Sequence, residues 1–327
     1  MKMIFINGAC LFMEKRNPNL VLISLIITVF VLTACSTQAE YPATGQQISA
    51  ERLKVVATTT IVGDVVSQVG GDLIELSVLL PIGTDPHGFD PAPQDISKVS
   101  EADLVFANGA GLEEFLDNLI ESAGAKDKVI QVSDGIDFLA LEGEGDEHDH
   151  TGTNPHTWTD PNNVVVWTYN IEQGLSKLDP KNASTYHANA EVYQTELETL
   201  DAWIREQVAR IPTENRKLVT DHNLFGYFAE EYGFKQVGAL IPGYSTLAEP
   251  TARELADIED AIQDLKVKAI FVGNTVNPAL AERVSEDSGI QLVFVFTGSL
   301  NDSDSEAGTY IEYMRYNTSA FVDALTP

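Results

Sequence analysis

The sequence predicts an α/β protein with two lobes, each built around a mostly parallel sheet. Short β-branched runs alternate with amphipathic stretches, which is typical of successive βα units. In the first lobe, residues 51–180, strands are expected at 53–57, 74–80, 104–107 and 128–132. In the second lobe, residues 213–327, strands are expected at 217–220, 236–240, 268–272 and 291–296. Helical patterns lie between them at 94–102, 112–122, 225–232, 252–265, 278–287 and 308–325.

A long linking helix, residues 181–212, is expected between the two lobes. Apolar residues recur there every three or four positions, which places them on one face of a helix. They are Tyr186, Ala190, Tyr193, Leu197, Leu200, Ile204, Val208 and Ile211. The periodic part at 183–211 would be about 43 Å long, so it predicts a stiff connection that spans both lobes. The alternative, a surface helix within one lobe, needs more surface than a small domain offers.

The first 34 residues are predicted to be a lipoprotein signal peptide. A basic pair precedes an uncharged run at 20–34, which is short for a membrane-spanning helix. The run ends in Leu32-Thr33-Ala34-Cys35, which resembles the bacterial lipobox, so Cys35 is the expected lipidation site. An ordinary secretory signal with an incidental cysteine is the alternative. The polar residues 35–50 are expected to form a tether between the anchor and the first lobe.

The overall composition excludes some partners and some kinds of site. A formal charge of −29 without clusters of Lys and Arg argues against a nucleic acid partner. The two cysteines are Cys10, inside the predicted signal peptide, and Cys35, so the mature chain would hold neither a disulfide nor a thiolate metal site. Translation could begin at Met1 or at Met13, since the residues before Met13 add nothing that a signal peptide needs.

Three of the six histidines lie at the ends of predicted strands or helices. His87 and His222 each follow a predicted strand, and His156 precedes a helix that Asp160 can cap. In parallel α/β sheets ligands bind beyond the carboxyl ends of the strands, so His87 and His222 already lie where a site is expected. A neutral imidazole binds a divalent transition metal through one nitrogen while its other nitrogen donates to a neighbouring acceptor. These three side chains are therefore candidate metal ligands.

Other charged residues close to these histidines could orient them or add ligands. Asp85 and Asp221 are close in sequence to His87 and His222 and are candidate acceptors for their rings. The stretch at 142–150 contains only glycine, acidic residues and histidine, so it is either a solvated loop or a weak, mobile metal collector. The remaining histidine of the folded part, His187, lies on the linking helix and is expected to be structural.

Three segments resemble the motifs of the zinc and manganese substrate-binding lipoproteins of ABC transporters. They are Asp85-Pro-His87, Asn154-Pro-His-Thr-Trp-Thr-Asp160 and Asp221-His-Asn-Leu-Phe-Gly-Tyr-Phe228, in this order. The resemblance covers nearly the whole chain from about residue 53 onward. It implies two α/β lobes bridged by a long rigid helix, with the metal site in the cleft between the lobes. It also implies that His87, His156 and His222 are the metal ligands and that a membrane permease of an ABC transporter is the partner.

One position departs from the pattern of that family. Family members often carry an aspartate ligand in a segment like Thr-Asp-Ser-Leu, where this chain has Thr297-Gly298-Ser299-Leu300. The fourth metal position is then left to water or to a nearby side chain, with Glu147, His148, His150 and Asp302 as the candidates. A site with many imidazoles and few oxygens favours Zn²⁺ over Mn²⁺, whereas Cu²⁺ and Ni²⁺ also accept imidazole ligands. Zinc is the expected metal, with copper and nickel still open.

The sequence thus predicts an extracytoplasmic or periplasmic receptor, anchored by lipid to the bilayer, that captures zinc and delivers it to an ABC transporter permease. The alternative is a zinc-dependent hydrolase, because three histidines and a bound water also form hydrolytic sites. The chain has no H-E-x-x-H motif and no obvious general base near the three histidines, so it is not expected to be an enzyme. We expect it to be a monomer.

Overall fold

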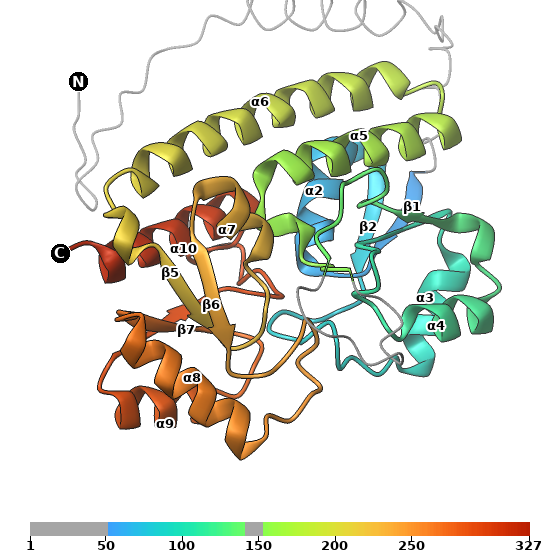
Figure 1. Cartoon of the computed structure of the whole chain (residues 1–327). Coiled ribbons are helices and arrows are strands. Elements are labelled where there is room, and N and C mark those ends of the chain that lie inside the picture. The colour runs from blue at the N-terminus through green and yellow to red at the C-terminus, as the bar shows by residue number, and fades with distance from the viewer. Residues whose placement is uncertain (1–51, 141–152) are drawn as a thin grey trace, which may run out of the picture. The chain divides into compact units, whose positions relative to one another are not determined.

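The structure is a computed structural model that describes residues 52–140 and 153–327. In this part of the chain there are two four-stranded parallel sheets, which confirms the predicted two-lobed α/β fold (Figure 1). The predicted signal peptide 1–34, the tether 35–50 with Cys35, and the acidic stretch 142–150 lie outside the described residues and stay predictions. Among the helices that the structure describes, none combines the length and the apolar composition needed to cross a bilayer.

The first lobe is built on a sheet with the strand order β2-β1-β3-β4. Its strands are β1 Leu53–Ala57, β2 Ile74–Val78, β3 Leu104–Ala107 and β4 Val129–Gln131. Its helices are α2 Thr60–Gly70, α3 Pro93–Glu101, α4 Leu116–Ala123 and α5 Pro161–Leu178. All four residues of β3 are buried, as expected for an inner strand of a parallel sheet that is covered on both faces.

The second lobe repeats this arrangement with the strand order β6-β5-β7-β8. Its strands are β5 Lys217–Thr220, β6 Lys235–Ala239, β7 Ala269–Gly273 and β8 Gln291–Val295. Its helices are α7 Gly226–Tyr232, α8 Ala252–Asp264, α9 Ala279–Ser288 and α10 Tyr310–Leu325. In both sheets the order reverses beside the first strand of the lobe, and such switch points are where open parallel sheets bind ligands.

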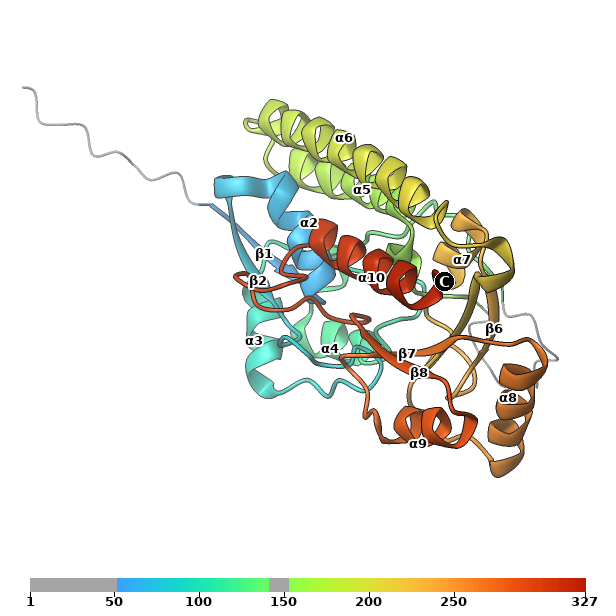
Figure 2. The same cartoon turned by 90° about the vertical axis from the view of Figure 1, so that its left-hand side faces the viewer.

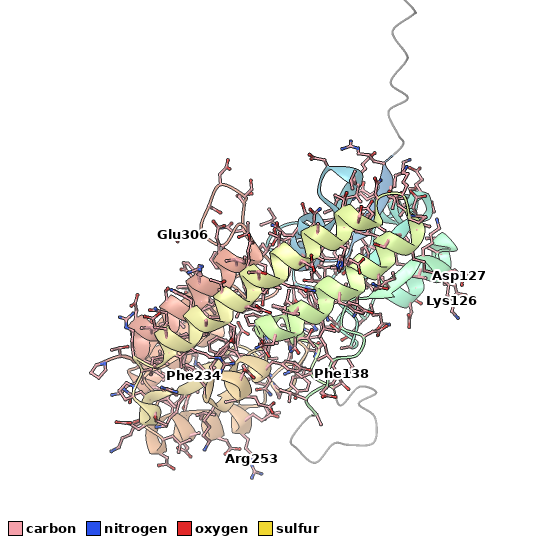
Figure 3. The ribbon with its side chains drawn as sticks, turned by 90° about the horizontal axis from the view of Figure 1, so that it is seen from above. Lys126, Asp127, Phe138, Phe234, Arg253 and Glu306 are labelled. Atoms are coloured by element: carbon pink, nitrogen blue, oxygen red, sulfur yellow. The ribbon has the colours of Figure 1, made fainter. Side chains whose placement is uncertain are left out.

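Helix α6, Ala183–Val208, links the lobes and runs over both of them (Figure 1). Its apolar face is buried along the whole helix, from Tyr186 to Val208, as the spacing predicted. The helix ends three residues before residue 211, where the predicted periodic pattern ends. A tight turn precedes Pro212, in which the backbone N–H of Ile211 donates to the carbonyl of Val208. Figure 3 shows α5 lying alongside α6, with Lys126 and Asp127 near one end of the molecule.

A single hydrophobic core joins the two lobes beneath α6. It contains residues of β1 and α2 from the first lobe, residues of β5 and α10 from the second lobe, and the buried faces of α5 and α6. Figure 2 shows α10 close to α2 on this side of the molecule. Separate small clusters lie under α3 and α4 and under α8 and α9. Because the interface between the lobes is large and apolar, it restricts their relative motion to small displacements.

Candidate metal centre

Three imidazoles meet between the lobes, beyond the carboxyl ends of the strands. His87 lies in the loop after β2, His156 in the loop before α5, and His222 directly after β5. The Nε2 atom of His156 is 3.2 Å from Nε2 of His87 and 3.3 Å from Nε2 of His222. In the described part of the chain, these side chains form the one group of three or more such donors close enough to hold a metal ion, with all donor atoms within 4.8 Å.

The three histidines are almost completely shielded from solvent. Their exposed fractions are 6% for His87, 0% for His156 and 2% for His222. The small cavity between the rings is also lined by residues of both lobes, namely Asp85, Pro86, Trp158, Leu224, Thr275 and Gly298. The rings of Trp158 and His156 pack in a T-shaped arrangement, with 5.2 Å between the ring centroids. Burial of this kind excludes bulk water and fixes the rings in one arrangement.

Two of the histidines are held by the same local turn. Asn154 and Asp85 each stand two residues before a histidine, with a proline between, and each accepts a hydrogen bond from that histidine's backbone N–H at 3.0 and 3.1 Å. Such turns are typical of Asn and Asp, whose short side chains reach the backbone two residues further on. The proline fixes the intervening backbone dihedral, so His156 and His87 leave the chain in defined directions.

The ring of His156 is oriented by a residue that the sequence analysis did not single out. Oδ1 of Asn154 lies 2.8 Å from Nδ1 of His156, which directs Nε2 toward the other two rings. Asn108, at the end of β3, donates from Nδ2 to the carbonyl of Pro155 at 3.0 Å and so ties this loop to the sheet. The shared Asx-Pro-His pattern of residues 85–87 and 154–156 was the sequence signal that could have identified Asn154.

The buried carboxylate of Glu113 holds the backbone at Asn108 in place. Glu113 accepts hydrogen bonds from the backbone N–H groups of Asn108 and Gly109 at 2.7 and 3.1 Å, and from the hydroxyl of Thr58 at 2.6 Å. Burial raises the pKa of Glu113, and the three donors partly oppose that shift. Because Thr58 follows β1 and Asn108 follows β3, this carboxylate joins the two central strands of the first lobe at the edge where His156 lies.

His222 is oriented by Asp221, the residue before it. Oδ1 of Asp221 lies 2.5 Å from Nδ1 of His222, and Oδ2 accepts the backbone N–H of Gly273 at the end of β7. The backbone carbonyl of His222 accepts from the hydroxyl of Thr220 at 2.6 Å. His222 is therefore fixed at the switch point between β5 and β7.

Asp85 has a different role from the one expected from the sequence. Its Oδ1 accepts from the backbone N–H of His87, and its Oδ2 accepts from the hydroxyl of Thr246, in the loop after β6. The carboxylate thus positions the backbone of His87 rather than its ring, and it also connects the first lobe to the second.

Burial keeps the imidazoles of His87 and His156 in their neutral form. The pKa of His87 is lowered to about 3, chiefly because burial disfavours the imidazolium and also because His222 is close. The pKa of His156 is lowered well below its ordinary value by burial and by the neighbouring rings of His222 and His87. A neutral imidazole has a free lone pair, so these two rings can accept a metal ion near pH 7 without first losing a proton.

The comparison with protein families identifies the chain. The model of the family described as "Zinc-uptake complex component A periplasmic" matches residues 55–324. The chain belongs to this family. The zinc-uptake component A family consists of substrate-binding proteins of ABC transporters and not of enzymes, which agrees with the expected absence of catalysis. The family description also confirms the expected extracytoplasmic location.

Relatives within this family carry names that refer to different metals. The chain is 38% identical over 304 residues to the manganese-binding lipoprotein MntA of Halalkalibacterium halodurans, covering 93% of this chain and 98% of the relative. It is 32% identical over 311 residues to the manganese ABC transporter substrate-binding lipoprotein PsaA of Streptococcus pneumoniae, covering 93% and 97%. The periplasmic zinc-binding protein TroA of Treponema pallidum has a similar structure, with a TM-score of 0.78, 27% identity, and coverage of 85% of this chain and all of that one.

Several residues named from the sequence do not lie at the three imidazoles. Asp302 is exposed and does not line the cavity, and its backbone carbonyl accepts from the N–H of Ser305. His187 is exposed on α6, with Nε2 3.5 Å from the carboxylate of Glu191. Glu147, His148 and His150 belong to the residues that the structure does not describe.

Gly298 lies on the wall of the cavity and has no side chain to offer. A Cβ at this position would be 2.8 Å from Cδ of Pro86 and 3.5 Å from the hydroxyl of Thr275. The second lobe therefore contacts the residue before His87 through the backbone of Gly298. In this arrangement the proline ring takes the space that a side chain at position 298 would need.

Proposed function

We propose that this protein captures zinc with His87, His156 and His222 and delivers it to the membrane permease of an ABC transporter. The observation that carries this proposal is the spacing of the imidazole nitrogens, 3.2 and 3.3 Å between Nε2 atoms. Two nitrogens bound tetrahedrally at a Zn–N distance of about 2.0–2.1 Å are separated by about 3.3–3.4 Å. Two of the three nitrogen–nitrogen distances therefore match those expected around tetrahedral zinc, and all the donor atoms lie within 4.8 Å of one another.

The donor set also supports zinc over manganese. Manganese prefers carboxylate, carbonyl and water oxygens, whereas zinc accepts neutral imidazoles readily. The three donors are all imidazoles, and Gly298 adds no carboxylate. A water molecule is the simplest fourth ligand, because Asp302 is exposed and away from the cavity. The manganese named for MntA and PsaA is therefore not carried over to this chain.

Delivery to a permease requires that the protein stays at the membrane. Cys35 follows a lipobox-like segment, and the relatives MntA and PsaA are named lipoproteins. We infer that Cys35 carries the lipid and that residues 36–50 give the folded lobes some reach toward the permease. Replacing Cys35 by Ser should release the protein from the membrane fraction, and retention of the variant there would argue against this anchor.

The decisive test is calorimetric titration of the purified protein with zinc, manganese, copper and nickel. His87→Ala, His156→Ala and His222→Ala should each lower zinc affinity at least about a hundredfold, since each removes one of three ligands. His187→Ala, an exposed histidine on α6, is the matched control and should bind like the wild type. Unchanged zinc affinity in the triple variant would refute the site. Analysis of the metal carried by protein isolated from its native host then tests whether zinc is the physiological cargo.

A further inference from the structure

A loop of the second lobe crosses the cleft beside the three histidines. Residues 241–250 lie between β6 and α8 and are attached to their own lobe by two backbone hydrogen bonds. The N–H of Ile241 donates to the backbone carbonyl of Asp221 at 2.7 Å, and the N–H of Asn223 donates to the backbone carbonyl of Gly243 at 3.1 Å. These bonds place the loop directly behind His222. Two of its side chains then form hydrogen bonds to the first lobe, and a third packs on it.

The first of these crossing contacts ends on the loop that carries His87. The hydroxyl of Thr246 donates to Oδ2 of Asp85, while Oδ1 of the same carboxylate accepts from the backbone N–H of His87 at 3.1 Å. Leu247 follows and packs over Gly88, since a Cβ at Gly88 would lie 3.3 Å from its Cδ2. The carboxylate of Asp85 thus connects the Thr246 hydroxyl to the backbone of His87.

The second crossing contact lies near His156. The hydroxyl of Tyr244 donates to the carbonyl of Ala140 at 3.1 Å, and its ring lies 6.3 Å from that of His156. The loop therefore contacts the first lobe near both His87 and His156. Among the described residues, the hydrogen bond made by Thr246 leads to His87 through the charged group of Asp85.

We propose that Thr246 is a positioning residue for metal retention: its hydroxyl holds His87, through Asp85, against the lobe that carries His222. The proposal rests on the proposed function of the three histidines. His87 and His222 come from different lobes, so a metal ion bound to both leaves most easily when the lobes separate. A hydrogen bond that exists only while the lobes are together opposes that separation and slows release. Hydrogen bonds to charged acceptors are among the stronger ones in proteins, so its loss should be measurable.

Other contacts between the lobes limit the size of the effect. Ser299 accepts the backbone N–H of Gly83 at 2.9 Å, and Thr60 accepts the backbone N–H of Leu300 at 2.8 Å. The shared core beneath α6 also stays intact when Thr246 is changed. A variant at Thr246 should therefore fold and still bind zinc, with its defect confined to how long zinc stays bound.

The test measures zinc release from the full-length protein into an excess of a chromogenic chelator by stopped flow. Thr246→Val removes the hydroxyl at nearly constant shape and should raise the release rate about tenfold, the size expected for one charge-assisted hydrogen bond. Thr246→Ser keeps a hydroxyl and should release zinc within about twofold of the wild-type rate, given that the hydrogen bond is retained. Ser245→Ala is the matched control, because the Ser245 hydroxyl oxygen accepts from the backbone N–H of Leu247, in its own loop, at 3.3 Å.

The outcomes separate this proposal from the proposed function. Wild-type protein that does not bind zinc would refute the function. Wild-type binding with equal release rates for wild type and Thr246→Val would refute the role of Thr246 and leave the function standing. Faster release from Thr246→Ser or Ser245→Ala to the same extent would also refute it, because loop disturbance and not the hydroxyl would then be the cause. If circular dichroism shows that Thr246→Val is unfolded, Thr246→Ala replaces it with the same expected rates.

Discussion

Asp221 connects His222 to the central strands of the second lobe. One carboxylate oxygen lies 2.5 Å from Nδ1 of His222, and the other accepts the backbone N–H of Gly273, 52 residues further along the chain. The imidazole can rotate only if one of these contacts is lost. Its Nε2 is therefore held 3.3 Å from Nε2 of His156, ready to share a metal ion.

Asp221→Ala should lower zinc affinity by about 10- to 100-fold, as is typical when the partner of a ligating histidine is removed. Asp221→Asn should have a smaller effect, because the amide oxygen can still accept from one of the two donors. Asp302→Ala, an exposed aspartate outside the cavity, is the control and should bind zinc like the wild type. Competition with a zinc chelator of known affinity measures all three, and equal affinities for wild type and Asp221→Ala would contradict this role.

The buried histidines should make the metal-free protein sensitive to mild acid. The pKa of His87 is lowered to about 3 in the folded state, from an ordinary value of 6.5. Below pH 6.5 the unfolded chain therefore takes up a proton at His87 that the folded chain does not, and the free energy of unfolding falls. At pH 5 the loss from this one residue is about 2 kcal/mol, and it grows until the pH approaches 3.

Urea unfolding of metal-free protein at pH 7.5 and pH 5 measures this effect. Three buried carboxyl groups also change the free energy of unfolding over this pH range, but in the opposite direction, because their pKa is raised in the folded chain. They are Asp64, Glu113 and Asp160. The pH dependence of the wild type alone therefore does not isolate the contribution of His87. His87→Gln should lose less stability between the two pH values than the wild type, by about 2 kcal/mol. His187→Gln changes an exposed histidine and should behave like the wild type. The same pH dependence in all three proteins would contradict the expectation.

Much of the fold was predictable because the short apolar segments that form the buried strands are clearly separated from the helical segments in the sequence. Strands β1, β3 and β5 match the predicted residues, and Asp160 caps α5 by accepting the N–H of Asn162 at 2.9 Å. Helix α2 was not assigned from the sequence, because its run of valines resembles a strand. The hydroxyl of Thr59, which accepts the N–H of Val62, provides the helix start.

Helix α4 begins four residues later than predicted, for a reason that lies in the backbone. Gly109, Ala110 and Gly111 all have positive φ, which breaks the helical pattern before Leu116. Glu113 then turns inward to bind the backbone of this loop, although two consecutive glutamates in an amphipathic pattern suggest solvent. A stretch of this kind is stabilised by contacts between strands, which local periodicity does not report.

Of the site, the sequence predicted the three histidines but not the contacts that residues distant in sequence make around them. The histidines stood out because each occurs in a motif with proline or aspartate at the end of an element. The contact between Thr246 and Asp85 joins residues 161 positions apart and has no sequence signal in either segment. The packing of Gly298 on Pro86 joins residues even further apart in sequence and depends on how closely the lobes approach.

The shared core beneath α6 should make the lobes unfold together. Leu197 is completely buried on the face of α6 that both lobes contact. Leu197→Ala should lower the free energy of unfolding by about 2–5 kcal/mol and keep a single transition. Leu178→Ala makes the same substitution at a side chain that is 46% exposed and should change stability much less. Two separate transitions in Leu197→Ala, followed by circular dichroism and by tryptophan fluorescence, would show that the lobes do not share one core.

Gly298 should control how closely the second lobe approaches His87. A Cβ at this position would lie 2.8 Å from Cδ of Pro86, closer than nonbonded carbon atoms normally come, and the ring of a proline cannot turn away as a flexible side chain can. Gly298→Ala should therefore force the lobes slightly apart and lower zinc affinity, with an overpacking cost of about 1–3 kcal/mol. Gly88→Ala is the matched control, since its Cβ would meet only the mobile end of Leu247 at 3.3 Å.

The same contact gives an expectation for manganese. Gly298→Asp adds the oxygen donor that manganese prefers, but its Cβ meets Pro86 just as that of alanine does. The single variant should therefore gain little manganese affinity, whereas Gly298→Asp combined with Pro86→Ala, which removes the obstructing Cδ, should gain more. Calorimetric titration of both variants with manganese and zinc measures the difference. A large gain in manganese affinity from Gly298→Asp alone would show that the lobes accommodate a side chain here at little cost, and that glycine at this position does not by itself restrict the metal.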